Sequence, residues 1–206
     1  AELLEHDALA QIESLRLSYT EAGPRTVTAI ASRERSKLRC LELEGSKFDV
    51  GAMMQMRRAE FPALRRLSLG NSSIDAASFL LAAPWIRQLE RLDLYGLMIR
   101  DLGVRNLIES GNEKLEVLSL TQNALGDDAI VHLGEAPWTR TLKTLSLARN
   151  GLSDKGLMPV LRSEWPALRQ LDLSGNVLST RSIEALLDGG FPSLEVLDIT
   201  DMMLTP

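Results

Sequence analysis

The stretch Leu168-Arg-Gln-Leu171-Asp-Leu173-Ser-Gly-Asn176-Val-Leu178 decides the fold of this chain. In an extended strand Leu171 and Leu173 are two residues apart, so their side chains point to the same face. That face carries only leucine and must be buried, whereas Gln170 and Asp172 point the opposite way. The stretch therefore predicts a short strand with one apolar side and one polar side.

The same spacing of three apolar residues recurs eight times. Its copies begin at Ile12, Leu38, Leu64, Leu89, Leu115, Leu142, Leu168 and Leu194, which lie 25 to 27 residues apart. A fixed period in this range is typical of one supersecondary unit stacked on copies of itself. We therefore expect a single elongated domain over residues 1–206. Residues 1–11 would form an N-terminal helical cap or partial repeat, and 12–206 eight repeats, the last one incomplete.

A polar residue follows six of the eight predicted strands at the bend. A buried asparagine can donate and accept hydrogen bonds, so stacked copies can satisfy backbone groups that the turn leaves unpaired. Later repeats place Asn123, Asn150 and Asn176 there, and the first three place the shorter hydroxyls of Thr20, Ser46 and Ser72. Leu97 and Met202 interrupt this predicted ladder.

The second half of each repeat has the apolar spacing of a helix. Candidate N-caps are Asp101, Asp127, Asp154 and Thr180 at one equivalent position, with Asp49 and Asp75 one residue earlier. Gly189-Gly190 follows a predicted helix and is interpreted as its C-cap. Proline and aromatic residues occupy the joints that lead to the next strand, and we expect the three tryptophans there to pack between repeats: Phe61-Pro62, Pro84-Trp85, Pro137-Trp138, Trp165-Pro166 and Phe191-Pro192.

Composition and charge exclude several classes of function. The net charge is −5, and residues 104–206 carry all of it, with 9 Lys/Arg against 14 Asp/Glu. A nucleic-acid partner is not expected, because such proteins need a basic face. No apolar run reaches the roughly 20 residues that cross a bilayer, so no membrane partner is expected. The acidic N-terminal residues do not resemble a secretory signal, and we expect a cytoplasmic protein, or an effector secreted without such a signal.

Residues that could carry chemistry are scarce. Cys40 is the single cysteine, which rules out an internal disulfide. The only histidines, His6 and His132, have no companion at metal-ligand spacing, so neither a metal nor a cofactor is expected. Cys40 lies at an outward strand position without a base at suitable spacing, and a nucleophilic role is disfavoured. We expect a protein that is not an enzyme.

The in-phase LxxLxLxxN motifs closely resemble the leucine-rich repeat family over about residues 12–204. The period near 26 and the helical back halves are similar to the ribonuclease-inhibitor-like or cysteine-containing subclasses, and Leu171-Asp-Leu-Ser-Gly-Asn-Val-Leu178 is similar to leucine-rich repeat proteins of bacteria. The resemblance implies an α/β right-handed solenoid, or horseshoe, with parallel strands on the concave face and helices on the convex face. It also implies recognition of a protein partner, commonly by the concave face.

The outward strand positions of the third to fifth repeats are the candidate binding surface. Arginine and tyrosine are the residue types that most often anchor protein interfaces. Arg66, Arg91 and Tyr95 would be neighbours on adjacent strands. The full candidate set is Arg66, Arg91, Asp93, Tyr95, Gln122 and Arg149.

Three hypotheses on function follow. The first is a non-enzymatic scaffold or recognition module that binds a protein partner. The second is a regulator of a partner enzyme, for example a GTPase-activator-like or effector protein, although no inserted loop breaks the period. The third is a structural assembly element. The last repeat ends in Asp201-Met-Met-Leu204 without a polar cap, so we expect this C-terminal edge to be the least protected part, or to be covered by self-association.

Overall fold

The structure is a computed structural model that describes residues 10–20, 22–32, 35–72 and 77–205. Most of the expected N-terminal cap, residues 1–9 with His6, lies outside the described residues, as does Asp75. The strands are β1 (Ser14–Arg16), β2 (Cys40–Glu42), β3 (Arg66–Ser68), β4 (Arg91–Asp93), β5 (Val117–Ser119), β6 (Thr144–Ser146), β7 (Gln170–Asp172), β8 (Val177–Ser179), β9 (Val196–Asp198) and β10 (Met203–Thr205). The α-helices are α1 (Pro24–Ala31), α2 (Val50–Arg58), α3 (Ala77–Leu80), α4 (Arg100–Glu109), α5 (Asp127–Ile130), α6 (Asp154–Arg162) and α7 (Thr180–Leu187), and the 3-10 helices are η3 (Pro84–Gln88), η4 (Leu133–Glu135) and η5 (Pro137–Arg140).

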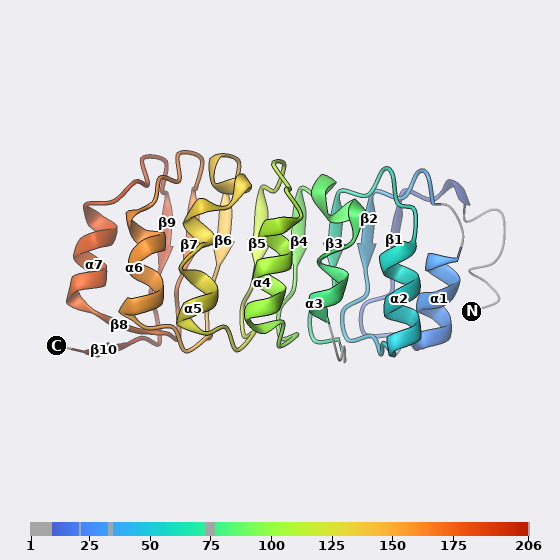
Figure 1. The fold of residues 1–206 in the computed structure, drawn as a ribbon, viewed down its shortest axis with the longest axis horizontal. Helices are drawn as coiled ribbons and strands as arrows, with labels where there is room; N and C mark the ends of the chain where they lie inside the picture. Colours follow the sequence, from blue (N-terminus) through green and yellow to red (C-terminus); the bar gives the residue numbers. More distant parts are fainter. Residues whose placement is uncertain (1–9, 21, 33–34, 73–76, 206) are drawn as a thin grey trace.

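One parallel sheet runs the length of the molecule. Among the described residues it has eight strands in the order β1-β2-β3-β4-β5-β6-β7-β9, and the helices form a layer on one side of it (Figure 1). The middle leucines of all eight strands align in register: Leu15, Leu41, Leu67, Leu92, Leu118, Leu145, Leu171 and Leu197. The predicted strands and their shared apolar face are therefore confirmed. A second, unpredicted pair joins β8 to β10.

The asparagine ladder forms as predicted. Asn150 donates from Nδ2 to the carbonyls of Leu120 and Leu147, both at 2.9 Å. Its Oδ1 accepts from the backbone N–H of Asn123 at 2.8 Å, and the Oδ1 of Asn176 accepts in turn from the Asn150 N–H at 3.1 Å. Because each side chain binds the backbone of the preceding repeat, the ladder joins neighbouring repeats.

The hydroxyl residues of the early repeats replace this ladder only in part. Ser72 donates to the Leu43 carbonyl of the preceding repeat at 2.9 Å. Thr20 donates within its own repeat, to the Leu17 carbonyl at 2.7 Å, and the buried Ser46 hydroxyl has no hydrogen-bond partner among the described residues. Leu97 has no polar side chain to continue the ladder, but its backbone N–H donates to the Oδ1 of Asn123 in the next repeat at 3.1 Å.

The aspartates that open α5 and α6 lie inside these helices, so the prediction that they are N-caps is wrong. Asp127 and Asp154 are the first helical residues, and Ser153 and Ser179 are the N-caps of α6 and α7. The Asp154 carboxylate accepts from the backbone N–H of Ser179 at 2.9 Å and from the Ser179 hydroxyl. The Asp127 carboxylate accepts from the backbone N–H of Ser153 at 2.9 Å. Each carboxylate therefore binds the cap of the next repeat.

The structure also describes the predicted N-caps Asp101, Thr180 and Asp49. Asp101 and Thr180 also lie within the first turn of their helices, so neither is an N-cap. Asp49 does cap α2 as predicted, because its side chain accepts from the Ala52 N–H at 2.7 Å.

Aromatic residues pack in the joints between repeats, as predicted. The rings of Phe61 and Trp85 meet edge to face, with centroids 5.5 Å apart. The indole N–H of Trp85 donates to the Met56 carbonyl of the preceding repeat at 3.1 Å. Trp138 and Trp165 are fully buried.

Helix length follows the position of the joint proline. In the repeats of α3 and α5 the prolines, Pro84 and Pro137, come five residues before the first leucine of the next strand pattern. In the repeats of α2, α6 and α7 that distance is two residues. Because proline disfavours helical geometry in the residue before it, the earlier proline ends the helix sooner. Thus α5 has four residues and α3 has four in the part of the chain that the structure describes, whereas α2 and α6 have nine.

The last described repeat is packed less closely than its neighbour. Leu194, Leu197 and Ile199 are only partly buried, whereas their counterparts Leu168, Leu171 and Leu173 are at most 1% exposed. No described repeat packs on their far side. Self-association through this C-terminal edge stays a prediction.

Candidate functional site

The outward side of the sheet, called here the strand face, consists of three rows of side chains. The first is Ser14, Cys40, Arg66, Arg91, Val117, Thr144, Gln170 and Val196, and the second is Arg16, Glu42, Ser68, Asp93, Ser119, Ser146, Asp172 and Asp198. The third lies two residues further along the chain and is Ser18, Glu44, Gly70, Tyr95, Thr121, Ala148, Ser174 and Thr200. The rows are polar because they alternate with the buried leucines.

Basic residues just before the strands are paired across neighbouring repeats. Four such ion pairs form, at N···O distances of 2.8 to 3.8 Å: Arg39–Glu13, Arg65–Glu90, Lys143–Glu116 and Arg169–Glu195. Parallel strands lie about 4.8 Å apart, so opposite charges in one row are well placed to pair. Pairing between repeats is therefore the usual arrangement for basic residues in this position.

Arg66 and Arg91 lie one position further along, in the first row of the strand face, which contains no acidic residue. They are direct neighbours in the register of β3 and β4, and both are exposed. Neither side chain forms an ion pair or hydrogen bond with any other described residue, although the charge of Arg91 acts on the nearby Asp93. Like charges directly opposite one another in a sheet are destabilising. Two adjacent guanidinium groups without a hydrogen-bonded acidic partner among the described residues are therefore suited to an anionic group.

A hollow of about 330 Å³ lies further along the same strand face, and neither Arg66 nor Arg91 lines it. Gly70 occupies the row position that Glu44 and Tyr95 fill in the flanking repeats, and its missing side chain leaves the space open. The lining residues are Tyr19, Glu44, Gly70, Asp93, Tyr95, Ser119 and Thr121. The hollow therefore combines two carboxylates, two hydroxyls and two phenol rings.

Hydrogen bonds orient the two carboxylates of the hollow. Glu44 accepts from the Ser68 hydroxyl, and Asp93 accepts from the Tyr95 backbone N–H at 3.0 Å. Burial raises the pKa of the Asp93 carboxyl above its ordinary value of 3.8, and the negative charge of Glu44 adds to this. Hydrogen bonds from Tyr95 and Ser119 and the charge of Arg91 oppose that rise. A cationic group in the hollow would relieve the unfavourable charge.

The raised pKa of Asp93 predicts a pH-dependent effect of Asp93→Asn. A group whose pKa is higher in the folded state costs stability above that pKa, and the cost disappears as pH falls toward its unfolded value. We therefore expect D93N to melt at a higher temperature than the wild type near pH 7, and the difference to vanish near pH 4. Thermal melts followed by circular dichroism at the two pH values would measure this.

Asp128→Asn is the matched control with the opposite sign. Its carboxylate bonds Lys155 at 2.8 Å, which lowers the Asp128 pKa. That pair contributes stability at neutral pH that is lost as pH falls through the folded pKa. D128N should therefore melt slightly lower than the wild type near pH 7. A D93N protein that melts at a lower temperature than the wild type at neutral pH would show that the charge of Asp93 does not destabilise the folded state.

The structure separates the other two candidate residues from the hollow. Gln122 and Arg149 are exposed at the turns after β5 and β6, with φ of 55° and 54°. Arg149 pairs with Asp201 at 3.3 Å, and its side chain lies over Gly175, where an added Cβ would come within 2.7 Å of the Arg149 Cγ. Asp93 and Tyr95 thus share the hollow, Arg66 and Arg91 are neighbours in the first row outside it, and Arg149 pairs with the last repeat.

Sequence reasoning missed the residues that shape the hollow. The strand pattern places Tyr19 and Glu44 at outward positions but indicates no role for them, and it does not single out Gly70. The available signal was the third row itself, because a glycine between two large side chains in a stacked row predicts a gap. The residue that opens the site carries no functional group of its own.

The remaining reactive residues offer little chemistry. Cys40 is buried, and its Sγ lies 3.6 Å from Glu42 Oε1. His132 is exposed and lies 3.6 Å from Glu135. Within the described ranges no group of three or more His, Cys, Asp or Glu could hold a metal ion. In that same part of the chain no helix is long and apolar enough to cross a membrane.

Comparison with known proteins agrees with this architecture. Residues 111–134, 140–161 and 166–187 each match the family model described as Leucine Rich repeat. No curated protein sequence matches the chain. The matched segments hold β5 to β7 with their helices, and the same strand register continues on both sides of them. Such repeats commonly mediate protein–protein interaction and are generally not catalytic. The three matched segments are leucine-rich repeats, and the in-register sheet extends the same strand pattern through the other described repeats.

Proposed function

We propose that this protein is a non-enzymatic recognition module that binds a protein partner through the strand face of its third to fifth repeats, β3 to β5. The observation that carries the proposal is the pair Arg66 and Arg91, which are adjacent and form no ion pair or hydrogen bond with the described residues. Basic residues one position earlier, such as Lys143 and Arg169, are paired between repeats. A surface that keeps two cations unpaired is suited to an anionic group of a ligand.

The hollow defines the second part of the ligand. Glu44 and Asp93 supply negative charge, and Tyr19 and Tyr95 supply aromatic rings, which together suit a lysine or arginine side chain. Tyr19 is 66% exposed, so it can contact a partner directly. We infer a partner segment that places a carboxylate on Arg66 and Arg91 and a basic side chain in the hollow.

The period and the helices support the ribonuclease-inhibitor-like subclass, as part of the same proposal. Repeats of 25 to 27 residues leave room for a helix opposite each strand, and α2, α4, α6 and α7 have eight to ten residues. The short α3 and α5 depart from this pattern because of their early prolines. We infer a long-repeat subclass with local variation in helix length.

Alanine substitution on the strand face tests the proposal. The wild-type chain is used to capture partners from lysate of its source cell, and the captured protein is identified by mass spectrometry and titrated. R66A, R91A and Y95A should each weaken binding, and truncation of a true anchor costs about 2 kcal/mol, or about thirtyfold in Kd. Isothermal titration calorimetry would measure the affinities.

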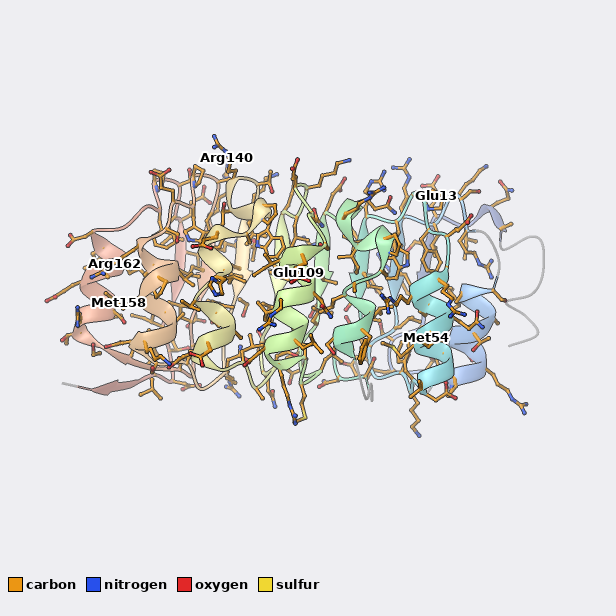
Figure 2. The ribbon with its side chains drawn as sticks, viewed as in Figure 1. Glu13, Met54, Glu109, Arg140, Met158 and Arg162 are labelled. Carbon is orange, nitrogen blue, oxygen red and sulfur yellow. The ribbon has the colours of Figure 1, made fainter. Side chains whose placement is uncertain are left out.

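Glu109→Ala is the control, because Glu109 is exposed at the end of α4 on the helical side (Figure 2). It should change the affinity by less than about 1 kcal/mol. Circular dichroism of each variant confirms that the fold is retained. If E109A weakens binding more than all three strand-face variants, the assignment to the strand face is wrong.

A further inference from the structure

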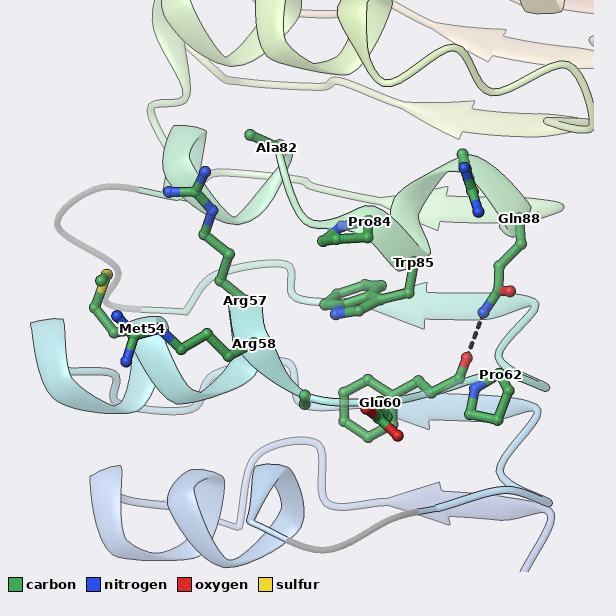
Figure 3. Close-up of a pocket in the computed structure, with 12 residues that line it drawn as sticks. Met54, Arg57, Arg58, Glu60, Pro62, Ala82, Pro84, Trp85 and Gln88 are labelled. Carbon is green, nitrogen blue, oxygen red and sulfur yellow. Dashed lines mark hydrogen bonds between the residues drawn. The ribbon is translucent and has the colours of Figure 1, made fainter.

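A second concave surface, called here the joint groove, lies between the end of α2 and η3 and has a volume of about 790 Å³ (Figure 3). α3 ends at Leu80, so Ala82 and the 3-10 helix η3, and not a further turn of α3, line the groove opposite the C-terminal turn of α2. The joint groove shares no lining residue with the hollow on the strand face.

The floor of the joint groove is apolar and rigid. Trp85 lies edge to face on Phe61 and is tied to the Met56 carbonyl by its indole N–H. Pro84 and Met54 extend the apolar surface to solvent, and Met54 is 40% exposed. Figure 3 shows Pro84 directly beside the Trp85 ring. A bulky apolar side chain could dock here without reordering the floor, which lowers the entropic cost of binding.

The rim of the joint groove is basic. Arg57, Arg58 and Arg87 line it, against the single carboxylate of Glu60. None of the three guanidinium groups forms an ion pair or hydrogen bond with another described residue. Arg57 reaches from α2 toward Ala82 across the groove, and Arg58 extends toward Met54 (Figure 3). The local excess of positive charge stands out because the whole chain carries −5.

We propose that the joint groove binds an acidic segment of a partner protein, with one bulky apolar side chain packed against the exposed Pro84 above the buried Trp85 and carboxylates on Arg57, Arg58 and Arg87. Charge complementarity selects an anionic partner, and guanidinium groups bind carboxylates in a bidentate fashion. A peptide fits better than a nucleic acid. Trp85 is only 5% exposed and offers no open face for base stacking. The net negative charge of the chain also disfavours a long polyanion.

A peptide selection tests this proposal. A display library of random peptides of about twelve residues is selected against the immobilised full chain, and enriched peptides are synthesised with a fluorescent label for anisotropy titration. The enriched sequences should combine acidic residues with a large aromatic or aliphatic residue. The double variant R58E/R87E should weaken binding about tenfold or more, and binding should weaken with added salt.

Arg162→Glu is the matched control. Arg162 is the exposed last residue of the nine-residue helix α6, as Arg58 is of α2, and Figure 2 shows it on the same helical side. R162E should leave the affinity within about twofold, and R66A/R91A should do the same because the joint groove is separate from the strand face. Failure of the strand-face proposal would therefore leave this result unchanged.

Three outcomes would overturn the proposal. Enriched peptides could lack acidic residues, or R162E could weaken binding as much as R58E/R87E. The third involves other probes: vesicles of phosphatidylserine and phosphatidylcholine, or a single-stranded oligothymidylate. If either of these binds in a manner that depends on Arg58 while no peptide does, the groove recognises a membrane surface or a nucleic acid and not an acidic protein segment.

Discussion

Asn150→Ala should lower the free energy of unfolding by about 2–4 kcal/mol, because it removes several buried hydrogen bonds at once. Asn150 is 6% exposed and donates to two carbonyls at 2.9 Å. It also accepts from the backbone N–H groups of Asn123 at 2.8 Å and Leu125 at 3.4 Å. Alanine would leave these groups buried without partners. Urea unfolding followed by circular dichroism would measure the loss.

Gln55→Ala is the control for this substitution. Gln55 also carries an amide, but it is exposed on α2 and forms no side-chain hydrogen bond with the described residues. Its replacement by alanine, a good helix former, should change stability by less than about 0.5 kcal/mol. Equal losses for N150A and Q55A would mean that the ladder contributes nothing beyond an ordinary surface amide.

The ladder also explains why the strand register could be predicted from the sequence. Leucines at a fixed spacing determine which face is buried, and a slip of one residue would place Leu171 and Leu173 in water. Asn176 then ties the bend to the carbonyl of Leu147 in the preceding repeat at 3.0 Å. The leucine spacing and the asparagine both lie within one repeat, so the stretch of residues 168–178 is sufficient to predict the strand and the bend that follows it.

Contacts between repeats were harder to predict. The aspartates at the helix starts resemble N-caps because the residue type and the local position are right. Their carboxylates instead bind Ser153 and Ser179 about 26 residues ahead, and no local rule indicates this. The N-cap interpretation failed by one residue at Asp154 and Thr180, because Ser153 and Ser179, which directly precede these two residues, are equally good caps.

The candidate site likewise has features that the sequence predicts and features that it does not. Arg66, Arg91 and Tyr95 are candidate binding residues because the sequence gives both their residue type and their outward position. The hollow on the strand face depends on the absence of a side chain at Gly70, and the joint groove depends on where Pro84 ends α3. A search for functional groups passes over both, because glycine and proline shape a surface without contributing polar side-chain atoms.

Gly190→Ala should destabilise the protein by about 2–3 kcal/mol, which corrects the interpretation of Gly189-Gly190 as a helix C-cap. Asp188 is the C-cap of α7, and neither glycine has a positive φ. Gly190 lies against the preceding repeat instead, where an added Cβ would come within 2.7 Å of the Ser163 carbonyl oxygen and 2.9 Å of the Glu164 Cα. Thermal and urea unfolding of G190A would measure the cost.

Hydrogen bonds restrict any movement of the backbone around Gly190. The carbonyl of Gly190 accepts from the Trp165 N–H at 2.7 Å, and Gly190 forms a parallel bridge with Glu164. Trp165 is itself fully buried, and its indole N–H donates to the Val160 carbonyl at 2.9 Å. To relieve the clash, the chain would have to move this bonded and packed tryptophan, so the strain would spread into the core of the preceding repeat.

Gly23→Ala separates this clash from the general effect of replacing glycine. An added Cβ at Gly23 meets nothing within 4 Å, and its φ of −92° is open to any residue. At this N-cap position alanine is somewhat less favourable than glycine, so G23A should cost no more than about 1 kcal/mol. If G190A were as stable as G23A, the backbone at Glu164 would be able to move away from an added Cβ at a low energetic cost. The packing of the two repeats would then not require a glycine at position 190.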